Sequence, residues 1–134
     1  LVIKNTIKIA LVGQPNVGKS MLINSISNAR LKVGNFSGVT VSKEQVFFDY
    51  KNFHIEIVDL PGAYSLNDYT IEEKVTKDFL NNEKYDIILN VLDSTNLQRN
   101  LLLSTELFAL DKKIIVALNR DDEAQKESIF IDEI

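Results

Sequence analysis

One short segment, GQPNVGKS at positions 13–20, has the residue types and the spacing that bind phosphate. It matches the pattern G-x-x-x-x-G-K-[ST], whose glycines let backbone N–H groups close around phosphate oxygens. A helix that begins at Lys19 would point the positive end of its dipole at the anion. Lys19 would reach the β- and γ-phosphates, and the Ser20 hydroxyl would bind Mg²⁺. A chance glycine-rich turn is the alternative, and the apolar run before the segment and the helical pattern after it argue against it.

Two further segments carry groups that could complete such a site. DLPG, Asp59–Gly62, ends an apolar run, so Asp59 could hold Mg²⁺ through a water and the Gly62 N–H could bond a γ-phosphate. Thr40 lies in NFSGVTV and could bind Mg²⁺ through its hydroxyl and the γ-phosphate through its N–H if its loop closes. Alone, DLPG is a common turn and Thr40 an ordinary strand-starting residue, so their weight comes from the combination.

A fourth segment, NRDD at Asn119–Asp122, indicates which base is bound. A carboxylate can accept hydrogen bonds from N1–H and the 2-amino group of guanine. Adenine offers neither donor and would leave the carboxylate unpaired, at roughly 1–3 kcal/mol or more. Asp122 is the expected carboxylate, whereas Asp121 could be surface charge. The four segments together predict a GTP-binding P-loop domain.

The elements that must position these segments alternate between strand and helix. Strands are expected at 7–13, 41–50, 52–60, 85–93 and 112–119, and helices at 20–30, 70–82 and 96–110. The second and third strands flank a short turn and are expected to form an antiparallel hairpin. This order predicts an α/β fold of the three-layer P-loop NTPase type, a mostly parallel sheet with one antiparallel hairpin strand and helices on both faces. Ligands bind such sheets beyond the carboxyl ends of the strands, where the four segments fall.

Single residues within these elements carry expectations as well. Thr70 is expected to cap the helix 70–82, with Glu73 completing a capping box. Gly34–Gly38 is expected to be a mobile loop, and His54 to be a surface or edge residue rather than a base. Inward-facing residues are expected to be Leu22, Ile23, Ile26, Ala29, Ile71, Val75, Phe79, Leu103, Leu107 and Leu110. A solvated helix face is expected at Glu72, Glu73, Asp78 and Glu83, and hairpin packing at Phe47, Phe48 and Phe53.

The bulk composition excludes several classes of protein. A length of 134 residues fits one domain, and 45% hydrophobic content is ordinary for a globular fold. The net charge of −4 argues against a broad nucleic-acid-binding surface. The absence of cysteine excludes disulfides, thiol catalysis and iron–sulfur ligation. No apolar run approaches the ~20 residues of a membrane span, so the chain is expected to be soluble and cytoplasmic.

Between the four segments, the sequence resembles the N-terminal G domain of the ferrous-iron transport protein B family, FeoB, within the TRAFAC-class P-loop GTPases. The resemblance rests on VGNFSGVTV, DLPGAYSL, VLDSTNLQRNLLL and VALNRDDEA, and runs from about Lys8 to Ala124. It implies a slow GTPase that uses GTP, GDP and Mg²⁺ and serves ferrous-iron uptake at the cytoplasmic face of the bacterial inner membrane. Its implied partner is the membrane permease portion of the same protein, with no nucleic acid. Residues 1–134 would be a single G domain that ends before the fifth, guanine-binding loop and lacks the family's helical and membrane domains.

The motifs and the resemblance together assign the site residues. The expected catalytic residues are Lys19, Thr40, Asn16 and Gly62, and the expected Mg²⁺ residues are Ser20, Thr40 and Asp59, the last through water. Nucleotide contacts are expected from Gly13, Gln14, Pro15, Asn16, Val17, Gly18, Lys19, Ser20, Met21, Gly38, Val39, Thr40, Asp59, Leu60, Pro61, Gly62, Asn119, Arg120 and Asp122.

Two positions depart from the most familiar GTPases. Ras-type proteins place a water-orienting glutamine directly after Asp-x-x-Gly, where this chain has Ala63. The resemblance implies that K⁺ acts in the role of an arginine finger, with Asn16 supplying a neutral oxygen. Alternatively, Asn16 stabilises the loop by bonding its own backbone. Arg120 stands where the family usually has methionine, and its aliphatic stem could lie along the base.

Two other functions are compatible with the same motifs. One is a nucleotide-dependent switch with negligible turnover, which single-turnover assays with and without K⁺ would distinguish. The other is an RNA- or ribosome-associated GTPase, which shares the NVGKS loop. The acidic balance and the PGAYSL block count against this last function.

Overall fold

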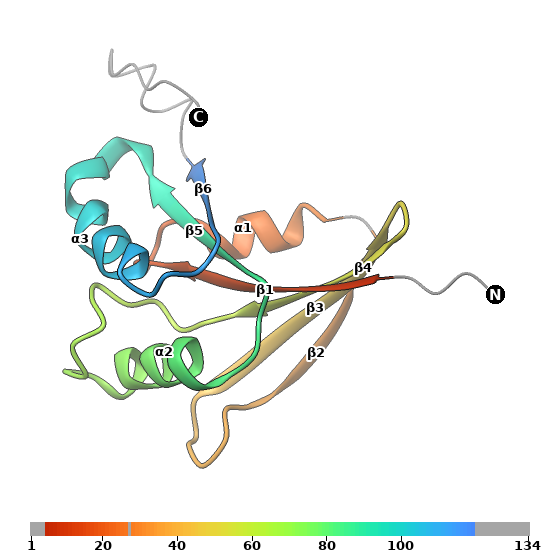
Figure 1. Ribbon diagram of the computed structural model, residues 1–134, viewed down its shortest axis with the longest axis horizontal. Coiled ribbons are helices and arrows are strands. Elements are labelled where there is room, and N and C mark those ends of the chain that lie inside the picture. Colours follow the sequence, from red (N-terminus) through yellow and green to blue (C-terminus); the bar gives the residue numbers. More distant parts are fainter. Residues whose placement is uncertain (1–4, 27, 120–134) are drawn as a thin grey trace.

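The computed structural model describes residues 5–26 and 28–119, and its centre is a six-stranded sheet with helices on both faces (Figure 1). The strands are β1 (Asn5–Gly13), β2 (Arg30–Asn35), β3 (Ser42–Tyr50), β4 (Phe53–Asp59), β5 (Ile87–Asp93) and β6 (Ile114–Asn119). Their order in the sheet is β2-β3-β4-β1-β5-β6, and β3 alone runs against the others. The predicted fold class, a P-loop NTPase fold with one antiparallel hairpin strand, is confirmed.

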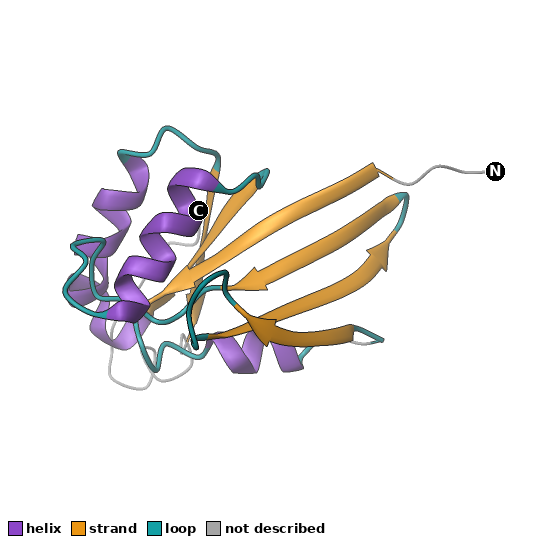
Figure 2. Cartoon of the chain, turned by 90° about the horizontal axis from the view of Figure 1, so that it is seen from below, coloured by secondary structure: helices purple, strands orange, loops and turns teal. Residues whose placement is uncertain are grey.

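Two clusters of buried side chains join the sheet to its helices. On one face, α2 (Ile71–Asn82) and α3 (Leu97–Phe108) pack against Ala10 and Val12 of β1. On the other face, α1 (Lys19–Asn24) packs against Leu11. Successive β1 residues belong to opposite clusters because side chains alternate along a strand, and Figure 2 shows the helices on either side of the sheet. This explains why the strand before the phosphate-binding segment is apolar at nearly every position.

Helix α1 is shorter than the sequence predicted, because it ends at Asn24 rather than at Arg30. The Ser25 hydroxyl donates to the Leu22 carbonyl (2.6 Å), and Asn28 has a positive φ of 60°. Serine and asparagine compete with helical bonding in this way, which explains the early end. The predicted inward face is still confirmed, since Ile23 is buried and Leu22, Ile26 and Ala29 pack against the same cluster.

Strand β2 is an element that the sequence analysis missed. Gly34 and Asn35 belong to this strand, so the prediction of one loop over Gly34–Gly38 is wrong for its first half. Every β2 residue is exposed, because the strand forms the outer edge of the sheet and pairs only with β3. An exposed edge strand has no buried face and therefore no alternating pattern to detect. The chain turns over residues 36–41, where Gly38 has a φ of 76°.

Helix α2 begins as predicted but presents a different face. The Thr70 hydroxyl accepts a hydrogen bond from the Glu73 N–H (3.0 Å), which confirms the cap. Val75 and Phe79 are buried, whereas Ile71 is 51% exposed, so the predicted stripe is wrong at its first member. Glu73 is also buried rather than solvated, because its carboxylate accepts bonds from Ser65. Glu72, Asp78 and Glu83 are exposed as predicted.

A short 3₁₀ turn, η1 (Ser94–Asn96), precedes α3, which therefore starts one residue later than predicted and ends at Phe108. Leu103 and Leu107 are buried, and Leu110 packs against the same cluster from just beyond the helix. No helix in the described part of the chain is long and apolar enough to cross a membrane.

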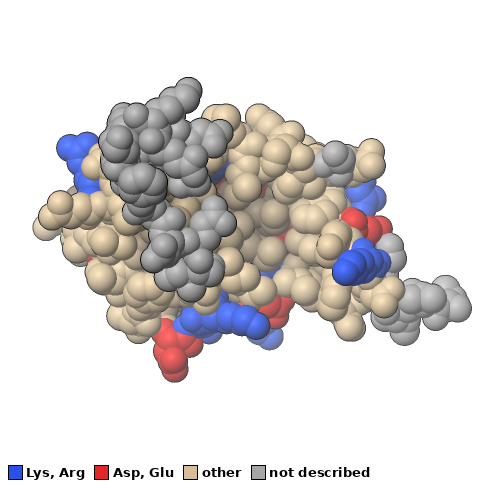
Figure 3. Space-filling model, turned by 90° about the horizontal axis from the view of Figure 1, so that it is seen from above, with Lys and Arg blue, Asp and Glu red and all other residues tan. Residues whose placement is uncertain are grey.

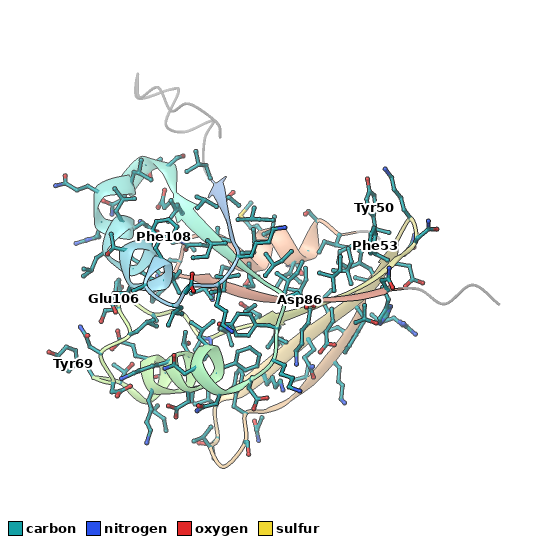
Figure 4. The ribbon with its side chains drawn as sticks, viewed as in Figure 1. Tyr50, Phe53, Tyr69, Asp86, Glu106 and Phe108 are labelled. Atoms are coloured by element: carbon teal, nitrogen blue, oxygen red, sulfur yellow. The ribbon has the colours of Figure 1, made fainter. Side chains whose placement is uncertain are left out.

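The predicted hairpin brings aromatic residues to the end of the sheet away from the phosphate-binding segment. Tyr50 and Phe53 lie at the β3–β4 turn, at the opposite end of the molecule from Tyr69 (Figure 4). The Phe47 ring stacks on His54, whose Nδ1 lies 2.8 Å from the Asp49 carboxylate. These contacts agree with a structural role for the aromatics and with a surface position for His54.

Candidate functional site

The phosphate-binding segment, residues 13–20, connects β1 to α1 at the carboxyl end of the sheet. Asn16 and Gly18 have φ values of 66° and 91°, so the loop turns through two left-handed residues. Glycine is favoured at position 18 because its φ of 91° disfavours a side chain. An added Cβ would also lie 1.9 Å from Asn119 Nδ2 and would displace the Asn119 side chain. Val17 is buried and packs in the same cluster as Leu11 of β1 and Ile23 of α1, which fixes the loop to the core. The loop is thereby shaped by the fold itself.

Lys19 crosses from this loop to the end of β4. Its Nζ lies 3.2 Å from Asp59 Oδ1 and donates to the Leu60 carbonyl. The Lys19 and Asp59 side chains are 11% and 19% exposed. Asp59 Oδ1 is buried and accepts no hydrogen bond from a described residue, so its nearest counter-charge is Lys19. Such an under-satisfied carboxylate oxygen is suited to holding a cation or the water bound to one.

The DLPG segment is bonded directly to the phosphate-binding loop. The Ala63 N–H donates to the Gly13 carbonyl (3.1 Å), and the Thr76 hydroxyl donates to the Pro61 carbonyl (3.0 Å). At Gly62 an added Cβ would lie 2.9 Å from the Pro15 Cα, and backbone cannot move aside as a flexible side chain could. Glycine at this position therefore lets the two segments touch.

These residues line an open cavity of about 490 Å³ at the carboxyl end of the sheet. Its lining residues are Pro15, Asn16, Lys19, Ser20, Val41, Ser42, Glu44, Asp59, Leu60, Pro61 and Gly62. The structure thus brings together the predicted Lys19, Ser20 and Asp59. Glu44 was missed by the sequence analysis, because its place in the cavity follows from the strand register that pairs it with Asp59. Only a predicted register of the β3–β4 hairpin could have found it.

The loop that carries Thr40 reaches this cavity only through Val41, the residue that follows Thr40. Thr40 is exposed, and neither Gly38, Val39 nor Thr40 lines the cavity. Phe36, earlier in the same segment, is buried. Its ring meets the Phe79 ring of α2 edge-on, with the ring centroids 6.2 Å apart. Met21, another predicted contact, is 72% exposed and does not line the cavity either. The roles assigned to these residues stay predictions.

Two carboxylates that the sequence analysis did not assign to the site hold the segment after DLPG. Glu73 Oε2 accepts from the Ser65 N–H (3.1 Å), and Glu106 Oε2 accepts from the Leu66 N–H (2.8 Å). Figure 4 labels Glu106 on α3 beside this segment. The connection from the site to α2 is therefore tied to both helices on that face of the sheet.

On its other side, the phosphate-binding loop contacts α3 and β6. Buried Gln14 donates through Nε2 to the Arg99 carbonyl (2.6 Å). A second cavity of about 220 Å³ lies there, lined by Gln14, Pro15, Asn16, Val17, Tyr64, Asp93, Asn96, Arg99 and Asn100. Asn16 therefore borders both cavities.

Asn119, at the end of β6, also supports the loop. Its Nδ2 donates to the Val17 carbonyl (2.8 Å), and its own carbonyl accepts from the Ser94 hydroxyl (2.7 Å). The predicted base-reading residues Arg120 and Asp122 lie outside the described residues. Asn119 thus joins the end of β6 to the phosphate-binding loop and to Ser94.

Replacing Asn119 with alanine should loosen this loop. The Val17 carbonyl would lose its half-buried partner, so we expect the free energy of unfolding to fall by about 1–2 kcal/mol. Urea denaturation measures this, with exposed Asn81→Ala as the matched control. Equal stability of Asn119→Ala and the unmutated chain would show that the bond does not support the loop.

The residues present fit the Mg²⁺ that the motifs predict. The Ser20 hydroxyl and the under-satisfied Asp59 carboxylate share one cavity, and hydroxyl and carboxylate oxygens are the ligands that Mg²⁺ prefers. Over residues 5–26 and 28–119, no group of three or more histidine, cysteine or acidic residues could hold a metal by itself. This part of the chain therefore offers no iron centre of that kind.

Comparison with known proteins agrees with this geometry. A family model described as "Ferrous iron transport protein B" matches residues 7–134. The Fe(2+) transporter FeoB of Campylobacter jejuni is 61% identical over 126 residues, which are 94% of this chain and 21% of that protein. The cytosolic domain of T. maritima FeoB in GDP form I matches at a TM-score of 0.90 and 40% identity, over 96% of this chain and 51% of that chain. Its GMPPNP form matches at a TM-score of 0.87 and 41% identity, over 91% of this chain and 48% of that chain.

The chain spans about a fifth of the length of the curated relatives it matches. Within that span, the family match covers both the phosphate-binding loop and the sheet that supports it. This chain therefore belongs to the ferrous iron transport protein B family and has the fold of its N-terminal G domain.

Proposed function

We propose that this chain binds GTP and GDP and hydrolyses GTP slowly. The observation that carries the proposal is the 490 Å³ cavity, in which Lys19, Ser20 and Asp59 meet beside a glycine-shaped loop. Lys19 supplies a positive charge for the β- and γ-phosphates, and the loop's N–H groups supply donors for their oxygens. The GDP and GMPPNP forms of the T. maritima relative support this assignment.

Ser20, Asp59 and Thr40 are the residues that would hold Mg²⁺, with Asp59 acting through water. When bound, Mg²⁺ bridges phosphate oxygens and neutralises the charge that develops on them during transfer. Thr40 lies outside the cavity, so its loop must move before its hydroxyl and N–H can contribute. The Gly62 N–H is the second backbone donor proposed for the γ-phosphate.

The proposed slowness follows from Ala63. Its methyl group is buried and cannot orient water, and its N–H is already bonded to the Gly13 carbonyl. Hydrolysis would therefore depend on backbone donors and cations rather than on a side chain. The same observation favours a second candidate, a conformational switch with negligible turnover, which single-turnover assays in K⁺ and in Na⁺ would separate from a GTPase.

We further propose that the chain is the G domain of a longer bacterial ferrous-iron transporter, at the cytoplasmic face of the inner membrane. Its partner would be the membrane permease portion of the same protein, whose iron uptake it would regulate or drive. The names of the curated relatives and their greater length support this. The net charge of −4 speaks against RNA as the partner, and the uncovered part of the face in Figure 3 carries no broad basic patch.

Asp122→Asn tests the proposed base specificity. The amide replaces one acceptor with a donor, so it meets the two guanine donors badly, and we expect GTP and GDP affinity to fall roughly tenfold to hundredfold. ATP binding should stay as weak as before. Calorimetry with GTP, GDP and ATP measures this, with neighbouring Asp121→Asn as the matched control. Equal losses for GTP and ATP would refute a base-reading role for Asp122.

A further inference from the structure

Glu44 of β3 places a second carboxylate in the cavity that holds Lys19 and Asp59. It is the register partner of Asp59 across the antiparallel β3–β4 pair, and it lines the cavity together with Ser20. Directly opposed residues of such a pair point to the same face, with Cβ atoms about 4.5–5.5 Å apart. Two acidic side chains from neighbouring strands therefore face one space.

The charges around this cavity are unbalanced. Among the described residues, Lys19 is the only basic one that lines the cavity, and its ammonium group is paired with Asp59 at 3.2 Å. Glu44 forms no ion pair with any residue in the described ranges. A carboxylate beside bound phosphates would repel them. A cation that lies between the two groups attracts both and offsets this repulsion.

We propose that Glu44 is a positioning residue for the divalent cation, adding its charge and accepting hydrogen bonds from the cation's water. The inference rests on the proposed function, because it needs a nucleotide in the cavity. It assigns to Glu44 a dual effect: the carboxylate strengthens cation binding and weakens binding of the nucleotide without a cation. Cation and nucleotide binding would thus be more strongly coupled than through Ser20 and Asp59 alone.

The experiment separates these two effects in the full chain. Glu44→Gln keeps the size of the side chain and removes its charge. Mn²⁺ serves as the probe, and its affinity for the GDP-loaded chain is measured by electron paramagnetic resonance. We expect about a tenfold weaker Mn²⁺ affinity in Glu44→Gln. GDP affinity in EDTA should be several-fold tighter, because the repulsion between Glu44 and the phosphates is removed.

Exposed Glu83→Gln at the end of α2 removes the same charge elsewhere and should leave both affinities within twofold. A general loss of structure would weaken GDP binding in EDTA as well, which is the opposite of the expected direction. Equal Mn²⁺ affinity in Glu44→Gln and the unmutated chain, with GDP bound to both, would overturn this inference alone. A chain that binds no GDP with or without Mn²⁺ would overturn the proposed function and this inference together.

Discussion

Replacing Lys19 with alanine is expected to abolish detectable binding of GTP and GDP. The Lys19 Nζ is held near the cavity by Asp59 and the Leu60 carbonyl, both of which are acceptors that a phosphate group could replace. Without Lys19, Asp59 would face the phosphates without its ammonium partner, so the variant both loses an attraction and gains a repulsion. Each charge-assisted hydrogen bond contributes about 1.5–3 kcal/mol, so an affinity loss of at least a hundredfold is expected.

Calorimetry with GTP and GDP measures this loss. Exposed Lys84→Ala removes the same charge away from the cavity and should keep the affinity of the unmutated chain. Lys19→Met separates charge from packing, since it keeps an unbranched apolar stem and should lose binding equally. Thermal unfolding of each variant checks that the fold persists. Retained GTP affinity in Lys19→Met would show that the segment 13–20 does not hold phosphate in the way proposed.

The sequence predicted the central elements of this fold because their patterns are strong and local. Strand β1 is apolar on both faces, and the Thr70 side chain caps α2 by accepting a hydrogen bond from Glu73, three residues further along the chain. Strand β2 escaped prediction because it buries nothing. Ile71 and Glu73 exchanged their expected environments. Glu73 is buried because Ser65, which lies eight residues before it and outside the helix, donates two hydrogen bonds to its carboxylate.

The residues of the site likewise differ in whether local sequence or long-range pairing places them there. Lys19, Ser20 and Asp59 could be predicted because each belongs to a short motif that ends or begins an element. Glu44 belongs to no motif, and it reaches the cavity through the pairing of two strands. The tether from Asn119 to Val17 likewise joins residues that are remote in sequence. Thr40 shows the converse case, because a motif predicts its role although Thr40 itself is exposed and does not line the cavity.

The second large effect concerns the cation that assists hydrolysis. Within the described residues, Lys19 is the only basic side chain that lines the larger cavity, and Ala63 cannot place water. Charge that develops between the β- and γ-phosphates therefore needs another positive group besides Mg²⁺. An arginine finger contributes on the order of 10³–10⁵ in rate, so a K⁺ ion in its place should raise the rate by at least about tenfold. We expect faster GTP hydrolysis in K⁺ than in Na⁺ at equal ionic strength.

Asn16 is the residue expected to hold this ion, because it is exposed at the turn of the loop and borders both cavities. Its φ of 66° also allows the competing explanation that it only shapes the turn. Asn16→Gly distinguishes the two, since glycine accepts that φ but removes the amide oxygen. The K⁺ effect should vanish in Asn16→Gly and Asn16→Ala while GDP affinity is largely kept, and exposed Asn82→Ala should retain the effect. If Asn16→Gly keeps the K⁺ effect and only Asn16→Ala loses it, the Asn16 side chain shapes the loop and another group holds the ion. Equal hydrolysis rates of the unmutated chain in K⁺ and in Na⁺ would exclude the K⁺ role altogether.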